Sequence, residues 1–290
     1  MTLYLIDANS LIHRAFHALP PFTAPDGRAT GALYGVSNIL FRILREKKPD
    51  YIAAAFDRPE PTFRREEYAE YKATRAEAAD ELIDQIIESR NLLETFGVSI
   101  FETSGWEADD ILVTLADKFK AVEGLRIVIF SGDLDILQAV DGDKVVAEVP
   151  QKGISQTTIY NQEAVVKRFG VGPDKLADYK GLVGDKSDNI PGVPGIGPKT
   201  AATIINKYGS LEEVFKEIEE LGLPDAKLQK KLEEHKDTAL LSKKLATLHT
   251  TAPIEVSLEE LAVKPFDTDK LSKYLTNLGF NSLVNKLYNN

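Results

Sequence analysis

The stretch LYLID at residues 3–7 is a short apolar run that ends in an aspartate. Four similar runs follow along the chain, at YIAAAF (51–56), VSIF (98–101), IVIF (127–130) and KVVAEV (144–149). Short runs rich in β-branched or aromatic residues are typical of strands. Helix-length segments separate the first four runs, and this alternation predicts a largely parallel α/β sheet flanked by helices.

Apolar residues recur at helical spacing in the segments between these runs. TGALYGVSNILFRIL (30–44) and ELIDQIIESRNLLETF (81–96) therefore predict helices. In the second half of the chain the strand signals fade, and helical patterns divided by glycine and proline take over, as in GPKTAATIINKYG (197–209). We expect an α/β body at residues 1–165 and a helical part at residues 166–290.

The composition limits the chemistry that the chain can carry out. The 290 residues include no cysteine and only four histidines. This excludes a disulfide framework, a thiolate nucleophile and a cysteine-based zinc site, and it disfavours a histidine metal site. No run approaches the roughly 20 apolar residues of a membrane span, and no secretory signal is recognisable. We expect a cytoplasmic protein whose chemistry depends on carboxylates, hydroxyls, lysines and arginines.

Acidic residues gather where the predicted strands end. Three apolar runs are followed by aspartate, and one more aspartate comes two positions after the last: Asp7, Asp57, Asp133 and Asp135. The stretch SGWEADDILVTLADKF (104–119) adds three carboxylates at the start of a predicted helix: Glu107, Asp109 and Asp110. A helix cap, a turn or the helix dipole explains any one of them. Their number indicates a site, because the carboxyl ends of parallel strands share one edge of the sheet, where ligands bind.

Carboxylates that lie this close raise one another's pKa unless a cation lies among them. Hard divalent cations prefer oxygen ligands, and magnesium usually keeps several waters while contacting few carboxylates directly. Two such ions about 4 Å apart activate a water and stabilise the leaving oxygen in a displacement at phosphorus. The sequence therefore predicts a divalent-metal site.

Several motifs together resemble those of one protein family. They are LIDANSLIHRAFHAL (5–19), AAFDRPEPTFR (54–64), YKATR (71–75), GWEADD (105–110), SGDLDILQ (131–138) and GLVGDKSDNIPGVPGIGPKTA (181–201). In order and spacing they resemble the bacterial 5′ nucleases, in particular the 5′-3′ exonuclease domain at the N-terminus of DNA polymerase I, over nearly the whole chain. The resemblance implies a Rossmann-like, PIN-like α/β body, a helical arch at about 62–92 and a helix-hairpin-helix at about 182–210 that holds duplex DNA.

The same resemblance implies nine metal-binding carboxylates. The chain has one at each matching position: Asp7, Asp57, Glu107, Asp109, Asp110, Asp133, Asp135, Asp185 and Asp188. Removing these nine from the 45 acidic residues leaves 36 against 35 basic ones, so the net charge of −10 does not exclude DNA as a partner. The implied cofactors are two or more Mg²⁺ ions, for which Mn²⁺ can substitute. Leu134 stands where the family usually has a lysine, and we expect altered local electrostatics but retained activity.

Nine crowded carboxylates should destabilise the folded protein when no metal is bound. We therefore expect Mg²⁺ to raise the melting temperature, since an ion that binds only the folded state stabilises that state. For the same reason we expect Asp185→Asn to stabilise the metal-free protein.

Basic and aromatic residues of the resembling motifs are candidates for contact with nucleic acid. Lys72 and Arg75 match family residues that contact phosphates near the scissile bond, where a cation offsets charge that develops in the transition state. Tyr71 is expected to stack on an unpaired base. Arg14, on the predicted helix after Asp7, is a weaker candidate for phosphate binding.

The stretch GVPGIGPKT (192–200) resembles a phosphate-binding P-loop, but Pro198 separates its last glycine from the lysine and no strand precedes it. Nucleotide binding is therefore rejected. A tight turn that leads into a helix presents backbone N–H groups that suit a DNA phosphate. The predicted contacts are Gly195, Gly197, Lys199 and Thr200, and the family resemblance adds a K⁺ ion at this hairpin.

These features lead us to expect a metal-dependent 5′-3′ exonuclease and 5′-flap endonuclease. Its substrates would be branched or nicked duplex DNA and RNA primers, in replication and repair. Two alternatives are a non-catalytic DNA-junction binder, which gains nothing from clustered carboxylates, and a PIN-like RNase, which would be shorter and lack the helix-hairpin-helix. We expect a monomer in the bacterial nucleoid, and the sequence fits both a free-standing exonuclease and a segment of a longer polymerase.

Overall fold

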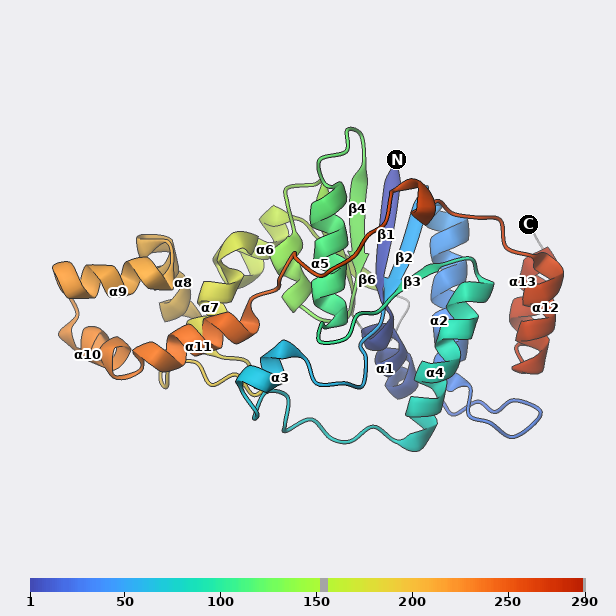
Figure 1. The fold of residues 1–290 in the computed structure, drawn as a ribbon, viewed down its shortest axis with the longest axis horizontal. Coiled ribbons are helices and arrows are strands. Elements are labelled where there is room, and N and C mark those ends of the chain that lie inside the picture. Colours follow the sequence, from blue (N-terminus) through green and yellow to red (C-terminus); the bar gives the residue numbers. More distant parts are fainter. Residues whose placement is uncertain (152–155, 289–290) are drawn as a thin grey trace.

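The computed structural model describes residues 1–151 and 156–288, and a six-stranded sheet lies at its centre (Figure 1). The strand order is β3-β2-β1-β4-β5-β6. Neighbouring strands are parallel except for β6, which is antiparallel to β5. The strand bounds are β1 Thr2–Asp7, β2 Tyr51–Ala55, β3 Ser99–Phe101, β4 Arg126–Phe130, β5 Val145–Pro150 and β6 Thr157–Tyr160.

The five apolar runs of the sequence form β1 to β5, so the predicted parallel α/β sheet is confirmed. Strand β6 is missing from the sequence-based prediction. Its sequence, TTIY, has four residues, of which only Tyr160 is buried. So short and exposed a strand gives no hydrophobic signal, and its pairing with β5 identifies it.

Helices cover both faces of the sheet, and the central strands are therefore buried on both sides. Leu3 and Leu5 of β1 face one layer, whereas Tyr4 and Ile6 face the other. Strands buried in this way read as continuous apolar runs instead of alternating ones. One layer contains α5 (Ala108–Phe119) and α6 (Gln162–Phe169). The other contains α1 (Ala8–Ala18), α2 (Gly31–Arg42), α4 (Asp80–Thr95), α12 (Thr268–Asn277) and α13 (Asn281–Tyr288).

A second group of helices lies at the end of the molecule opposite to α12 and α13 (Figure 1). Its members are α7 (Leu176–Val183), α8 (Pro198–Tyr208), α9 (Leu211–Glu220), α10 (Ala226–Glu234) and α11 (Lys236–Ala246). Helix α7 packs on both α8 and α11. The chain then crosses back over the body, so that α12 packs on α4 and not on the second group. Every helix in the described ranges is too short or too polar to span a bilayer.

Short irregular helices complete the chain. A π-helical turn, Ile43–Lys47, continues α2. Three connections contain 3₁₀ turns: Asp135–Ala139, Pro173–Lys175 and Glu259–Leu261.

The segment expected to form a helical arch is helical only at its two ends. Helix α3 (Phe63–Glu67) is short, α4 begins at Asp80, and residues 68–79 between them form turns and irregular structure. Most of these twelve residues are exposed, and Tyr71 alone is buried. A segment with so little apolar surface has no face to pack, and helix propensity alone rarely holds a short helix together.

The loop at 184–193, which leads into the predicted hairpin before α8, brings two backbones into close contact. The backbone N–H of Val193 donates to the carbonyl of Leu182, and both Gly184 and Gly192 have positive φ angles. A Cβ atom on Gly192 would lie 2.6 Å from the carbonyl carbon of Val183. Residue 192 must therefore be glycine, because the φ angle is positive and because no room exists there for a Cβ atom.

We predict that Gly192→Ala destabilises the protein more than Gly142→Ala. Both glycines have positive φ angles, but a Cβ on Gly142 would meet nothing within 4 Å. Gly142→Ala should cost about 1–2 kcal/mol for the left-handed conformation alone. Gly192→Ala should add roughly 1–3 kcal/mol for steric overlap. Chemical denaturation of both variants measures the difference, and equal losses would show that the close approach carries no cost.

Candidate active site

A cavity of about 550 Å³ opens at the carboxyl edge of the sheet, beside the ends of β1, β2 and β4. Five of the nine predicted carboxylates line it: Asp7, Asp57, Glu107, Asp109 and Asp133. Asp7 is the last residue of β1, Asp57 lies two positions after β2, and Asp133 lies in the loop after β4. Glu107 is the N-cap of α5, and Asp109 lies in its first turn. The parallel sheet and the start of α5 thus bring together residues up to 126 positions apart.

Two of these carboxylates carry a cost when ionised. Burial raises the pKa of Asp7 to about 7, with a further increase from the charge of Asp57, although a hydrogen bond from Ser131 opposes the shift. Burial, and then the charges of Asp7 and Asp133, raise the pKa of Asp109 well above its ordinary value. Asp109 Oδ1 is buried, and no hydrogen-bond partner for it exists among the described residues.

The cavity offers donors that suit a divalent cation. A buried carboxylate oxygen without a partner, surrounded by like charges, is strongly disfavoured unless a cation neutralises it. In the described part of the chain, no three acidic or histidine side chains converge closely enough to enclose an ion. The buried oxygen of Asp109 is the feature of the cavity that fits a divalent cation.

Two cations from the predicted arch pair with predicted carboxylates at the cavity. Lys72 Nζ lies 2.9 Å from Glu107 Oε1, and Arg75 Nη2 lies 2.6 Å from Asp188 Oδ1. Burial lowers the pKa of Lys72, but Glu107 and Asp188 more than offset this and raise it above its ordinary value. Lys72 is therefore charged at neutral pH, and both side chains line the cavity.

Tyr71 does not have the exposed ring that stacking on a base requires. Its side chain is 4% exposed, and its hydroxyl lies 3.2 Å from Glu107 Oε2 and 3.2 Å from Asp188 Oδ2. The hydroxyl donates to these carboxylates, and Lys72 lies over the ring. The ring anchors the segment to the body in this structure, and its stacking on an unpaired base stays a prediction.

A third cation, Lys180 of α7, lies between two more of the predicted carboxylates. Its ammonium pairs with Asp135 and, at 2.7 Å, with Asp185. Burial alone would raise the pKa of Asp185, but Lys180 and Ser187 outweigh it and hold the pKa below its ordinary value. Lys180 thus supplies a positive charge beside Leu134, the position where the resemblance leads one to expect lysine.

Asp110 points away from the cavity. Its two oxygens accept a bidentate pair of bonds from Arg64, at 2.6 Å and 2.8 Å, and Oδ1 also accepts the backbone N–H of His249 at 2.9 Å. Both Asp110 and Arg64 are fully buried. Arg64 also donates to Glu107 Oε2 at 3.1 Å and to the carbonyls of Leu245 and Thr247. In this structure Asp110 holds the start of α5 in place, and its predicted metal contact stays a prediction.

The remaining predicted residues occupy two places. Arg14 lines the cavity and donates to the carbonyl of Gln151. The four hairpin residues lie outside the cavity, in the turn before α8 and in its first turn, and all four are exposed: Gly195, Gly197, Lys199 and Thr200. The structure thus separates them from the carboxylates.

Sequence reasoning overlooked two residues of the site, Arg64 and Lys180. Arg64 ends the motif AAFDRPEPTFR, and Lys180 stands five positions before Asp185. Basic residues at fixed places beside an acidic cluster are the signal that could have identified them, since buried carboxylates need partners.

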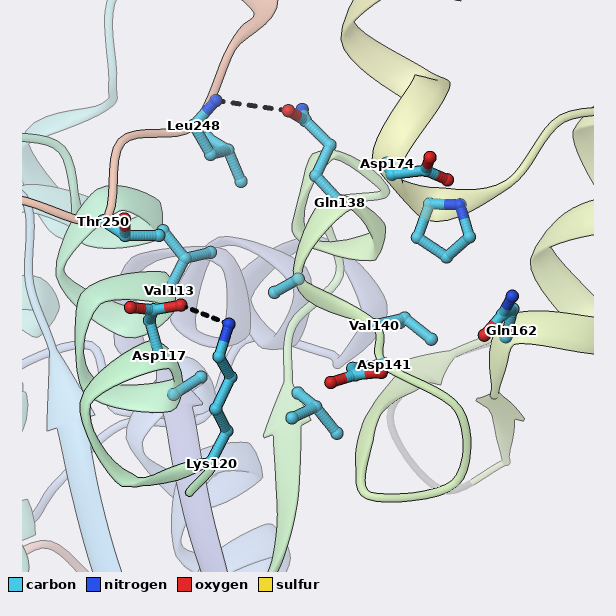
Figure 2. A pocket seen from close by; sticks show the side chains of 14 residues that line it. Val113, Asp117, Lys120, Gln138, Val140, Asp141, Gln162, Asp174, Leu248 and Thr250 are labelled. Atoms are coloured by element: carbon cyan, nitrogen blue, oxygen red, sulfur yellow. Dashed lines mark hydrogen bonds and ion pairs between the residues drawn. The ribbon is translucent and has the colours of Figure 1, made fainter.

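A second cavity, of about 420 Å³, lies beside the later turns of α5 and contains none of the predicted site residues (Figure 2). Asp117 pairs with Lys120 at its rim. Gln138 accepts the backbone N–H of Leu248 and donates to the carbonyl of Ala246, which fixes the segment after α11 to the body. The cavity therefore marks a structural junction, and its ion pair offers controls for substitutions in the site.

Comparison with known proteins identifies the family. The model of the 5′-3′ exonuclease N-terminal resolvase-like domain matches residues 2–170, and that of the 5′-3′ exonuclease C-terminal SAM fold matches residues 171–269. The chain belongs to the 5′-3′ exonuclease family. A 5′-3′ exonuclease of Aquifex aeolicus is 39% identical over 99% of this chain and 95% of that protein. DNA polymerase I of Bacillus subtilis is 42% identical over 98% of this chain. The match covers 32% of that polymerase, so the chain spans about a third of its length.

Solved structures share the fold. The T5 5′-exonuclease with bound zinc ions superimposes with a TM-score of 0.71 at 20% identity, over 99% of this chain and 97% of that one. The catalytic core of Rad2 in complex with a DNA substrate gives a TM-score of 0.62 at 17% identity, over 98% of this chain and 90% of that one. At these identities the likeness confirms the architecture of both parts of the chain.

The structure reverses the expectation that Asp185→Asn stabilises the metal-free protein. The depressed pKa of Asp185 means that its ionised form favours folding above the pKa of the unfolded state, so its loss should lower the melting temperature. Asp109 has the opposite sign, because its raised pKa means that ionisation at neutral pH opposes folding. We therefore predict that Asp109→Asn melts at a higher temperature than wild type in chelator at pH 7, and Asp185→Asn at a lower one.

Magnesium provides the matching measurement. It should raise the melting temperature of wild type and raise that of Asp109→Asn less, because the variant has lost a ligand. If the two aspartates shift the metal-free melting temperature in the same direction, the electrostatic difference between them is misassigned.

Proposed function

We propose that the chain is a structure-specific 5′ nuclease that hydrolyses phosphodiester bonds of DNA and of RNA primers at 5′ flaps and 5′ ends. The observation that carries the proposal is one cavity lined both by carboxylates and by Lys72 and Arg75. Anionic groups that bind cations and cationic groups that bind phosphate are the two requirements of phosphoryl transfer. The relatives named 5′-3′ exonuclease and DNA polymerase I support the same function.

The carboxylates of the cavity would hold divalent cations, with Mg²⁺ as the physiological ion and Mn²⁺ as a substitute. Asp109 is the strongest candidate ligand, since its Oδ1 is buried without a partner among the described residues. Bound cations would lower the pKa of the attacking water and neutralise charge on the phosphate. The zinc ions in the T5 5′-exonuclease support this assignment. The other predicted carboxylates belong to the proposed site either directly or through Lys180, Arg64 and, for Asp188, Arg75.

Lys72 and Arg75 would bind the scissile phosphate and its neighbour. Lys72 is 25% exposed and Arg75 is 49% exposed, so both can exchange a carboxylate partner for a phosphate. A cation held over the reacting phosphate stabilises the charge that develops as the bond breaks. Arg14 lies on α1, which also borders the cavity, and would extend this phosphate contact along the strand.

The hairpin before α8 would hold the duplex. Its backbone N–H groups stand at the N-terminus of an eleven-residue helix, where phosphate binding is favourable. Gly195 and Gly197 allow a close approach, Lys199 and Thr200 add side-chain contacts, and K⁺ is a proposed ligand of the turn. Recognition would depend on shape and on the phosphate backbone. The catalytic core of Rad2, which shares the fold, is in complex with a DNA substrate, which supports DNA as the ligand.

We further propose a division near residue 165, between the catalytic body and the part that binds duplex. The protein would act as a monomer on DNA of the bacterial nucleoid, either alone or joined to polymerase domains. The two alternative functions, a non-catalytic junction binder and a PIN-like RNase, are tested by the cleavage experiments described next.

Cleavage of a labelled 5′-flap duplex tests the proposal directly. Wild type should release the flap with Mg²⁺ and not in chelator. Asp109→Asn should lose cleavage but keep duplex affinity, because the hairpin lies outside the cavity. Asp117→Asn is the matched control, since it lies on the same helix in an exposed ion pair with Lys120 and should cleave normally. The absence of any magnesium-dependent product from wild type would rule out the nuclease function.

We predict that Lys72→Ala slows single-turnover cleavage about a hundredfold, as expected when one group that stabilises the transition state is removed. The affinity for the flap duplex should change much less, because on this proposal most phosphate contacts would lie at the hairpin. Lys120→Ala removes a lysine from an ion pair outside the cavity and is the control. A loss of affinity with an unchanged rate for the bound complex would reduce Lys72 to a steering charge.

A further inference from the structure

The turn that carries Lys72 is bound to the loop that leads into the hairpin. The backbone N–H of Lys72 donates to the carbonyl of Asp188 at 2.9 Å. In return, the side-chain amide of Asn189 donates to the carbonyl of Glu70 at 2.8 Å. Two hydrogen bonds in opposite directions therefore join residues 70–72 to residues 188–189.

Both partners hold an unfavourable backbone conformation at this contact. Lys72 and Asn189 each have a φ angle of 56°, and Lys48 is the only other non-glycine residue with positive φ among those described. A left-handed conformation costs about 1–2 kcal/mol for a residue with a side chain, although asparagine tolerates it better than lysine. Such residues persist where their surroundings determine the conformation, and they gather at functional sites.

The Asn189 side of the contact continues into the hairpin. Asp185 and Ile190 exchange backbone hydrogen bonds at 2.9 Å and 2.8 Å, which closes the loop that contains Asn189. Gly192 then donates to Ser242 Oγ on α11. Only five residues separate Asn189 from the turn at Gly195, so a shift of the hairpin would be transmitted to Asn189.

The Lys72 side of the contact continues into the cavity. Lys72 Nζ lies 2.9 Å from Glu107, and Arg75, three positions on, lies 2.6 Å from Asp188 itself. Apart from these bonds, the exposed segment 72–79 has little apolar packing to fix its position. The placement of Lys72 therefore depends on the two bonds to residues 188–189, together with the buried side chain of Tyr71 beside it.

We propose that Asn189 is a positioning residue that couples the hairpin to Lys72. Its amide fixes the turn at residues 70–72, and thereby places the ammonium of Lys72 over the cavity when duplex is held at the hairpin. The expected effect of Asn189 on the cleavage rate rests on the proposed nuclease function. Its structural basis, the bond from Asn189 to Glu70, can be tested without any activity.

Two substitutions separate the amide from the backbone conformation. Asn189→Asp keeps the size of the side chain and its tolerance of positive φ, but an ionised carboxylate cannot donate to a carbonyl. Asn189→Gly removes the side chain and relieves the strain. Asn206→Asp is the matched control, because Asn206 donates its amide to the carbonyl of Gly170 at an exposed site of the same half of the chain.

Limited trypsin digestion tests the structural part. Cleavage after Lys72 and Arg75 should be several-fold faster in both Asn189 variants than in wild type or Asn206→Asp, because the turn has lost one of its two hydrogen bonds. Equal cleavage rates in all four proteins would overturn the proposal, whatever the enzyme activity. Thermal melts of each variant confirm that the proteins are folded.

A double-mutant cycle tests the coupling to chemistry. Asn189→Asp should lower single-turnover flap cleavage about tenfold, which is the effect of losing one hydrogen bond of roughly 1.4 kcal/mol. In a Lys72→Ala background the same substitution should have little further effect, because residues that act through one another are not additive. The proposal would be overturned if Asn189→Asp slowed cleavage by the same factor in the Lys72→Ala background as in wild type. It would also be overturned if Asn189→Gly cleaved as fast as wild type. A wild type that cleaves nothing would instead refute the proposed function, with the trypsin result still standing.

Discussion

Repulsion among carboxylates at the carboxyl edge of the sheet is the constraint on which the rest of the structure depends. A parallel sheet ends several strands at one edge, and here an aspartate follows three of those strands. Burial raises the energy of these charges, as the raised pKa values of Asp7 and Asp109 show. Neither hydrophobic packing nor strand pairing can offset such a cost, and cations from elsewhere in the chain are required.

Four cations answer this requirement, and they come from two parts of the chain. Arg64 of α3 and, in the turn beyond it, Lys72 and Arg75 belong to the arch segment, whereas Lys180 lies on α7. Arg64 also reaches the carbonyls of Leu245 and Thr247 at the end of α11. The balance of charge therefore joins the body, the arch segment and the second group of helices. A buried guanidinium that loses a partner typically costs several kcal/mol, so these ion pairs resist separation of the parts.

Sequence patterns predicted what depends on local periodicity and on topology. The strands were recognisable because burial on both faces makes them continuously apolar, and their aspartates could be placed because parallel strands end together. The non-helical turns at residues 68–79 and the burial of Tyr71 could not be predicted in this way. Both depend on contacts with Glu107 and Asp188, which are distant in sequence. Asp110 was assigned to the metals by resemblance, while its bidentate pairing with Arg64, 46 residues away in sequence, is seen only in the structure.

The ordinary explanation of an acidic residue at a helix start and the functional one are compatible in this protein. Asp7 caps α1 through Ser10, and Asp57 accepts the backbone N–H of Ala108 at the start of α5. Each cap uses one lone pair of a carboxylate that has about four acceptor positions, so the same group can still bind a cation. The cap also fixes the direction in which the carboxylate points, which is what a metal ligand requires. Helix capping at the edge of a parallel sheet thus orients the acidic side chains before any ligand binds. Asp109 is the exception: its Oδ1 has no partner among the described residues, so capping does not account for this carboxylate.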